Sequence, residues 1–284
     1  MTRVIPICLI IAASPFFAGC GEEDEGRNAA WHKEQGDYYY MNGRFDQAHA
    51  QYILSLEKDD EFIPSMLALV YACRMQGKLE FVKAPNEYGK RLMEAKYREA
   101  LHWGMKVLEE EKGNDDGLHA IGLLYYDASG DSETRLDTAL EYFDRALDHN
   151  PRHTWAQYYR AWCFFLKGVK ARGEGARLEE KGQGEEAKKK FALCSRWYVK
   201  AANAMSDHLE NWEKAKGEDA PREADWRNWI AMLKEMAGAG GEITGRAKEF
   251  GDRIKGAHPG RESGSVREGE EGVAEEDLPP GVRK

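Results

Sequence analysis

Two histidines are the first residues whose spacing suggests chemistry. His149 and His153 lie four positions apart, as two metal ligands on one face of a helix do. Pro151 stands between them, and a proline breaks the helix that would align the two rings. A metal site is therefore not expected at this position.

The segment 127–138 resembles a calcium loop only at its start. Asp127, Ser129 and Asp131 alternate along the chain as the first oxygen ligands of such a loop do. Ser132 stands where the sharp turn needs a glycine, and Thr138 stands where the loop needs its closing glutamate. Asp131 is more simply explained as a turn residue between two helices.

No other catalytic motif has the spacing that its chemistry requires. The sequence has no GxSxG nucleophile elbow, no Walker phosphate loop, no dinucleotide fingerprint and no CxxC pair. We therefore expect a protein that is not an enzyme and that needs no cofactor and no metal. A new kind of enzyme would need a cluster of buried titrating groups, which spacing does not reveal.

The elements that would position any site are clearest in the segment 118–151. Apolar residues recur at helical spacing in its first and second halves, which predicts two amphipathic helices. Gly122 lets the two backbones approach closely, and Phe143 fills the space between them. Pro151 ends the second helix, because proline cannot continue a helix interior.

This order of small, aromatic and helix-ending residues resembles a tetratricopeptide (TPR) repeat, a helix–turn–helix unit of about 34 residues. Less regular copies of the pattern lie on both sides of it. They cover the segments Gly36–Tyr52, Pro64–Gly104 and Trp155–Phe191. The resemblance implies an all-α solenoid of three to five irregular helical hairpins over residues 29–215, a fold that holds partners and rarely performs chemistry.

Two of these units are longer than one repeat. The matching positions Ala68 and Gly122 are separated by well over one period, and so are Ala139 and Ala187. Either some hairpins are extended, or a decayed unit lies at roughly 168–201.

The end of the solenoid needs a cap, and residues 216–237 are expected to form it. Trp226, Trp229, Ile230 and Leu233 fall on one helical face, with Pro221 near the first turn. The alternative is an amphipathic helix that binds a partner. Residues 238–284 are rich in glycine, proline, serine and charge, a composition that predicts a flexible or disordered tail.

The amino end has the pattern of an export signal. Arg3 precedes a short apolar run, and Phe17-Ala18-Gly19-Cys20 resembles a bacterial lipobox. The resemblance implies a lipoprotein signal peptide over residues 1–19, a lipid anchor on Cys20 and an acidic tether over residues 20–28. The alternative is an ordinary signal peptide. Gly21, in place of an aspartate, favours the outer membrane and leaves open which side the protein faces.

Three cysteines, Cys73, Cys163 and Cys194, would remain in the mature chain. Cys73 and Cys163 lie in apolar first helices and are expected to behave as small hydrophobes, although a Cys163–Cys194 disulfide within one hairpin is conceivable.

The net charge of the chain is −9, and no broad basic excess favours nucleic acid as a partner. The basic cluster Lys188–Lys190 follows Glu185 and Glu186 at i,i+4 spacing, so a solvated helix face explains it.

The TPR resemblance further implies that outward-facing residues of the first helix of each unit line a peptide groove. By helical phase, twelve residues are expected there: Lys33, Asp37, Tyr40, Phe62, Leu69, His119, Leu123, Tyr126, Asp127, His153, Arg160 and Phe164.

These patterns together predict a membrane-tethered TPR lipoprotein of the bacterial cell envelope. We expect it to act as a scaffold or assembly factor, in one version similar to a pilotin, that binds another envelope protein or peptide segment. The alternative is a surface or periplasmic receptor for a small ligand or glycan, with an aromatic pocket near Tyr38, Tyr39 and Tyr40.

Overall fold

A computed structural model describes residues 27–130, 132–216 and 223–238 of the chain. Within these ranges the chain forms helices and no strands, as the sequence predicts for an all-α fold. The helices are α1 (Ala29–Met41), α2 (Phe45–Lys58), α3 (Ile63–Lys83), α4 (Glu87–Glu110), α5 (Asp115–Asp127), α6 (Glu133–His149), α7 (Thr154–Glu180), α8 (Gly184–Lys216) and α9 (Glu223–Gly238).

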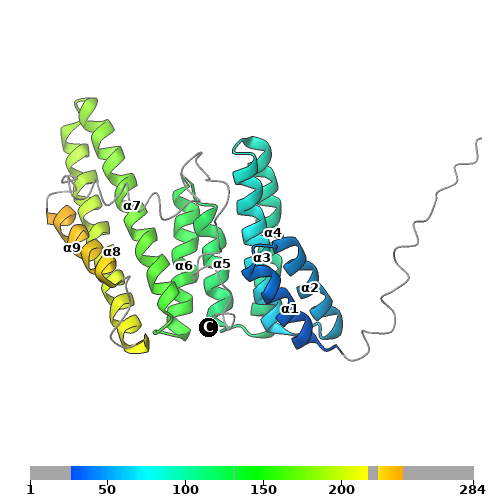
Figure 1. Cartoon of the computed structure of the whole chain (residues 1–284). Coiled ribbons are helices and arrows are strands. Elements are labelled where there is room, and N and C mark those ends of the chain that lie inside the picture. Colours follow the sequence, from blue (N-terminus) through cyan, green and yellow to red (C-terminus); the bar gives the residue numbers. More distant parts are fainter. Residues whose placement is uncertain (1–26, 131, 217–222, 239–284) are drawn as a thin grey trace, which may run out of the picture.

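The helices pair into four antiparallel hairpins that stand side by side in one row (Figure 1). The pairs are α1–α2, α3–α4, α5–α6 and α7–α8, and α9 packs against α8 at the end of the row. Each hairpin contacts the next one, so the core runs through the whole stack. This arrangement confirms the predicted helical-hairpin solenoid.

Side-chain caps explain where several helices begin. Asn28, Asn86 and Asn114 each accept a hydrogen bond from a backbone N–H in the first turn of the helix that follows. Ser132 does the same for α6, and the ring of His153 does so for α7. These contacts satisfy backbone donors that a helix leaves without an internal partner.

One glycine–aromatic contact holds each hairpin closed. In the α5–α6 hairpin, a Cβ added to Gly122 would lie 2.5 Å from Cε1 of Phe143. The same contact joins Gly36 to Tyr52, Gly77 to Tyr97 and Gly168 to Tyr198. An aromatic ring on the second helix thus fills the space left by a missing side chain on the first.

Two hairpins are extended, and this accounts for the irregular spacing of the repeats. α3 and α4 have 21 and 24 residues and α7 and α8 have 27 and 33, whereas α1 and α5 have 13 each. The segment 168–201 belongs to the long α7–α8 hairpin, so the alternative of a decayed extra unit there is wrong. A further contact, between Gly175 and Phe191, closes the extended part.

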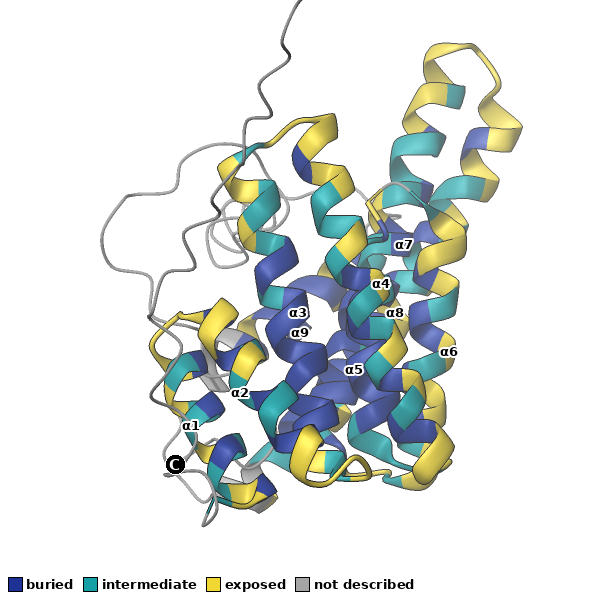
Figure 2. Ribbon diagram, turned by 90° about the vertical axis from the view of Figure 1, so that its right-hand side faces the viewer, coloured by how far each residue is buried: buried dark blue, intermediate teal, exposed yellow. Residues whose placement is uncertain are grey.

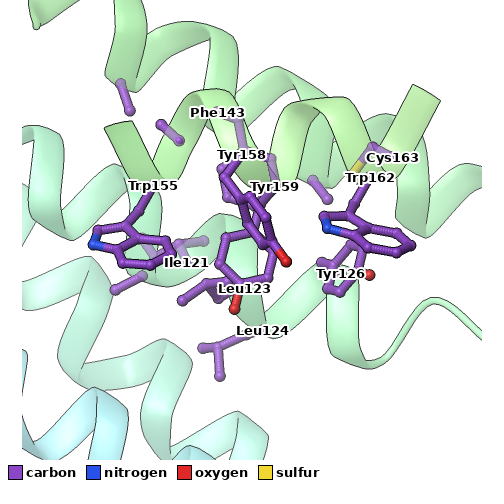
Figure 3. Packing of buried hydrophobic residues seen from close by; sticks show 14 of the residues in the cluster. Ile121, Leu123, Leu124, Tyr126, Phe143, Trp155, Tyr158, Tyr159, Trp162 and Cys163 are labelled. Carbon is purple, nitrogen blue, oxygen red and sulfur yellow. The ribbon is translucent and has the colours of Figure 1, made fainter. Parts of the chain in front are cut away.

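Buried residues follow the middle of the stack, and exposed residues gather at the hairpin tips (Figure 2). Residues of α5, α6 and α7 share this core (Figure 3), and the ring of Phe143 stacks on that of Tyr159 with 6.1 Å between the centroids. None of the helices in the described ranges combines the length and the apolar character needed to cross a membrane.

The α9 helix caps the stack as the sequence predicts. Trp226, Trp229, Ile230 and Leu233 are all buried. The ring of Trp229 stacks on Trp162 of α7 with 4.7 Å between the centroids. The end of the apolar core is therefore covered by a helix of the chain itself.

The Cys163–Cys194 disulfide is not formed, because Cys194 keeps a free, buried thiol. Several further expectations lie outside the described residues: the signal peptide at 1–19, Cys20 and most of the tether, Pro221, and the tail beyond Gly238.

Candidate partner-binding face

All twelve residues expected in a groove lie on α1, α3, α5 and α7 or at the ends of these helices. Five of them are half-buried: Lys33, Asp37, Phe62, Asp127 and Arg160. The other seven are buried: Tyr40, Leu69, His119, Leu123, Tyr126, His153 and Phe164. We call the side of the stack formed by these four helices the first-helix face.

The seven buried residues do not face outward as expected. The reason is that a first helix has neighbours on several sides. α3, for example, contacts α1, α2, α4 and α5, and every residue from Ser65 to Arg74 is buried. Helical phase within one repeat does not reveal these contacts with neighbouring units. A role in partner binding stays a prediction for all twelve residues.

A polar group at α1 begins the first-helix face. Lys33 Nζ lies 2.6 Å from Asp37 Oδ2, and the hydroxyl of Tyr52 donates to Asp37 Oδ1 at 2.9 Å. Burial raises the pKa of Asp37, although the hydrogen bonds from Lys33 and Tyr52 oppose the shift. The carboxylate is thus held by two partners in a poorly solvated place.

A buried polar contact of the face joins three helices. Arg74 of α3, with only 2% of its side chain exposed, places Nε 2.6 Å from Oδ2 of Asp127 at the end of α5. The hydroxyl of Tyr97 on α4 donates to the same oxygen at 3.4 Å. Lys78 Nζ lies 3.6 Å away from it. The second and third units are therefore joined by charge as well as by apolar packing.

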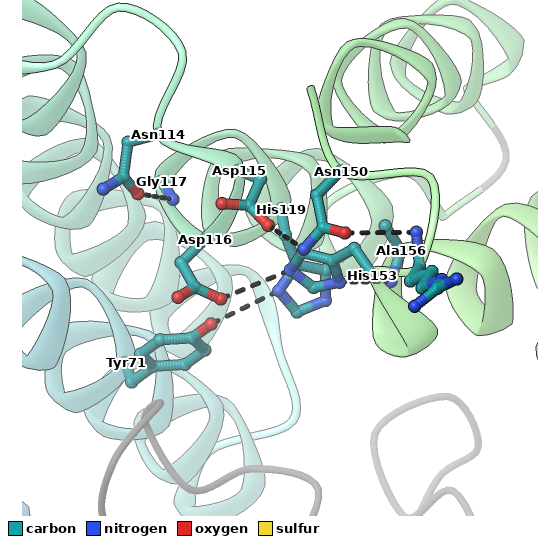
Figure 4. Close-up of polar contacts among 10 residues, drawn as sticks. Tyr71, Asn114, Asp115, Asp116, Gly117, His119, Asn150, His153 and Ala156 are labelled. Atoms are coloured by element: carbon teal, nitrogen blue, oxygen red, sulfur yellow. Dashed lines mark hydrogen bonds and ion pairs between the residues drawn. The ribbon is translucent and has the colours of Figure 1, made fainter. Parts of the chain in front are cut away.

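A pair of histidines lies where α5 meets α7 (Figure 4). The ring centroids of His119 and His153 are 4.7 Å apart, and Tyr71 Oη lies 3.3 Å from His119 Nδ1. His153 Nδ1 accepts the backbone N–H of Ala156, so its proton must be on Nε2. That nitrogen lies 3.3 Å from a carboxylate oxygen of Asp116, in a geometry that makes no hydrogen bond.

The last unit continues the polar series with Arg160 and Lys167 of α7. Arg160 Nε lies 2.8 Å from Asp144 Oδ1, and Lys167 pairs with Asp137. Burial raises the pKa of Asp144 against the opposing charge of Arg160. Arg160 also lines a hollow of about 320 Å³ together with residues of α6 and α8.

Polar groups thus recur on each first helix of an otherwise apolar stack. Arg74, His119, His153 and Lys167 are buried, so the half-buried members of the series, such as Lys33 and Arg160, are the ones that a partner's side chains could reach. Sequence reasoning missed Arg74, Tyr71 and Tyr97. A signal existed for Arg74, because it is the one charged residue in the apolar run from Met66 to Met75.

Stacked antiparallel hairpins, each closed by an aromatic side chain on a helical glycine, define a repeat solenoid of the tetratricopeptide class. No protein-family model matches the chain. The sequence is, however, 32% identical over 130 residues to the photosystem I assembly protein Ycf3 of Rippkaea orientalis (strain PCC 8801 / RF-1). The match covers 44% of this chain and 68% of that protein.

The chain therefore belongs to the tetratricopeptide-repeat family, as that assembly protein does. Among solved structures it matches the crystal structure of the MamA protein with a TM-score of 0.37 and 13% identity. That match covers 84% of this chain and 98% of the other.

Proposed function

We propose that this protein is a lipid-tethered scaffold of the bacterial cell envelope that binds another protein through the first-helix face. The observation that carries the proposal is the recurrence of ionic and hydrogen-bonded groups along that face. Polar groups are costly to bury, and four successive units each keep at least one. A row of such groups suits an elongated partner that contacts several units at once.

A small-ligand receptor fits the chain less well. Tyr38 is 61% exposed and Tyr40 is fully buried, because consecutive residues of a helix point in different directions. Two hollows of the described surface, of about 320 and 350 Å³, are more polar than apolar in their lining, and neither includes a tyrosine. Ligand pockets are usually lined mostly by apolar and aromatic side chains.

The assembly role is the finer part of the proposal. The relative from Rippkaea orientalis bears the name of an assembly protein, and repeat solenoids offer long surfaces on which subunits can be held. The lipobox-like Phe17–Cys20 segment supports a membrane tether. We therefore propose that the protein holds a component of an envelope complex during its assembly, as a pilotin does.

Site-specific photo-crosslinking in cells tests the proposal. A crosslinking amino acid at Lys33 or Arg160 is expected to capture one and the same protein. Exposed positions on the second helices, such as Tyr88 of α4 and Val199 of α8, serve as controls and are expected to capture it less.

Equal capture from both sides of the stack would contradict a first-helix interface. Capture of no protein, together with thermal stabilisation by a sugar or metabolite, would instead support the receptor.

A further inference from the structure

Three side chains with metal-binding atoms meet where the first two units join. His49 of α2, Cys73 of α3 and Glu99 of α4 have ligand atoms that all lie within 4.8 Å of one another. His49 Nε2 is 2.7 Å from Glu99 Oε1. The sequence gives no sign of this cluster, because the three residues come from three helices and form no short motif.

The chemistry of the three ligands selects one class of metal. A thiolate and an imidazole favour zinc over calcium or magnesium, which prefer oxygen ligands. Three protein ligands with a fourth position left for water are common around zinc. A thiolate and a carboxylate carry two negative charges, which would neutralise a divalent ion in this partly buried place.

We propose that His49, Cys73 and Glu99 form a binding site for a zinc-class divalent cation that links the first unit to the second. This inference is independent of the proposed function, because it concerns the joint between units and not the first-helix face.

The ligand atoms already lie within 4.8 Å of one another, so an ion can enter with shifts of about 1 Å or less. Zinc lies about 2.0–2.3 Å from its ligands in a tetrahedral arrangement, which sets the ligand atoms about 3.3–3.8 Å apart. The His49–Glu99 contact would therefore open by about half an ångström or slightly more. Cys73 is fully buried and fixed, whereas His49 and Glu99 are 21% and 34% exposed and can adjust. The ion would approach from their side.

Lys96 opposes binding of a cation. Its Nζ lies 3.1 Å from Glu99 Oε2, so its positive charge sits beside the site. Lys96 is about as exposed as Glu99, so it can turn into solvent when an ion takes over the carboxylate. Replacing Lys96 should therefore strengthen metal binding, a sign opposite to that expected for the three ligands.

Cobalt(II) titration of the purified full chain tests the site, because a cobalt–thiolate bond gives a charge-transfer band in the near ultraviolet. We expect this band in the wild-type protein and its loss on addition of zinc. Cys73→Ser should abolish the band, whereas Cys194→Ser, which removes another buried thiol, should keep it. Absence of the band in the wild type, or its persistence in Cys73→Ser, would overturn the proposal.

Variants of the two half-exposed ligands show whether metal binding is lost because a ligand is missing or because the protein misfolds. His49→Gln and Glu99→Gln should each weaken cobalt binding by ~10-fold or more while the circular dichroism spectrum stays that of the wild type. Lys96→Gln should bind cobalt several-fold more tightly. If the His49 and Glu99 variants fold and bind cobalt as the wild type does, the cluster is a hydrogen-bonded group and not a metal site.

Discussion

At the scale of single residues, the Arg74–Asp127 ion pair is expected to matter for stability. Removing one partner of a buried ion pair destabilises the folded protein more than replacing both partners by apolar residues does. The reason is that the remaining charge stays buried without its counterion. The side chain of Arg74 is 2% exposed and that of Asp127 is 11% exposed. The pair also lies at the joint between the second and third units.

We expect Asp127→Asn to lower the free energy of unfolding by about 3 kcal/mol, measured by urea denaturation, because Arg74 would keep its charge without this carboxylate. The double variant Arg74→Met, Asp127→Leu should recover much of the loss. Glu210→Gln, which breaks an exposed pair with Lys214, should leave stability close to that of the wild type. An Asp127→Asn protein as stable as the wild type would contradict a structural role for the pair.

The glycine–aromatic contacts make a second residue-scale prediction. Gly122→Ala should destabilise the protein by about 1–3 kcal/mol, because the added methyl group would collide with the buried ring of Phe143. Chemical denaturation measures the loss.

Gly173 offers the matched control for Gly122. It lies in α7, and the nearest atom to an added Cβ is 3.9 Å away on the flexible end of Arg177. Gly173→Ala should therefore stabilise the protein by about 0.5–1 kcal/mol, since alanine has the better helix propensity. Equal effects of the two substitutions would mean that ring packing is not what requires glycine at position 122.

At the scale of helices, the junction of α7, α8 and α9 contains a buried histidine in an aromatic cage. His208 of α8 donates from Nδ1 to the carbonyl oxygen of Thr154, and its ring lies 4.5 Å from that of Trp226. Burial lowers the pKa of His208 to about 4, and the hydrogen bond to Thr154 opposes this only in part. The cage therefore holds the neutral imidazole.

Acid should loosen this junction. The unfolded chain binds a proton at His208 near pH 6.5, whereas the folded protein binds it only near pH 4. Between pH 6.5 and pH 4 the unfolded state thus binds more protons than the folded state. The free energy of unfolding therefore decreases as the pH is lowered, by about 3 kcal/mol in total. His208→Gln should show a shallower decline in denaturation experiments across this range. An unchanged slope would exclude His208 as the source.

The helices were predictable to different degrees from the sequence. The α5–α6 hairpin could be placed closely because Gly122, Phe143 and Pro151 each have a local reason for their position. The lengths of α3, α4, α7 and α8 could not, because apolar periodicity does not say how far a hairpin extends beyond its repeat.

The exposed residues of the first-helix face were harder to predict than the helices, because the burial of residues such as Leu69 and Leu123 depends on neighbouring units. The His49–Cys73–Glu99 cluster was out of reach for the same reason. It exists only once three separate helices have packed.

At the scale of the whole molecule, the proposed lipid tether on Cys20 would decide where the proposed scaffold acts. Cys20→Ser should move the protein from the membrane fraction to the soluble fraction, because the lipid is expected to provide the anchor. Cell fractionation with detection of the protein measures this change, and Cys194→Ser is the control. A Cys20→Ser protein that still sediments with membranes would contradict lipidation as the main tether.

The row of hairpins also has a kinetic consequence. Beyond marginal contacts, the described helices touch only helices one or two positions away along the chain, so contacts form across short loops. Chains dominated by such local contacts fold quickly, and each hairpin can pack on the preceding one as soon as it leaves the ribosome. Of the described helices, α9 is synthesised last. The aromatic residues at the end of the α7–α8 hairpin would therefore stay exposed to solvent until α9 packs against them. In refolding of the full chain, α9 has its packing partner only once α8 has formed, so pulsed hydrogen exchange should show α9 protected after the hairpins.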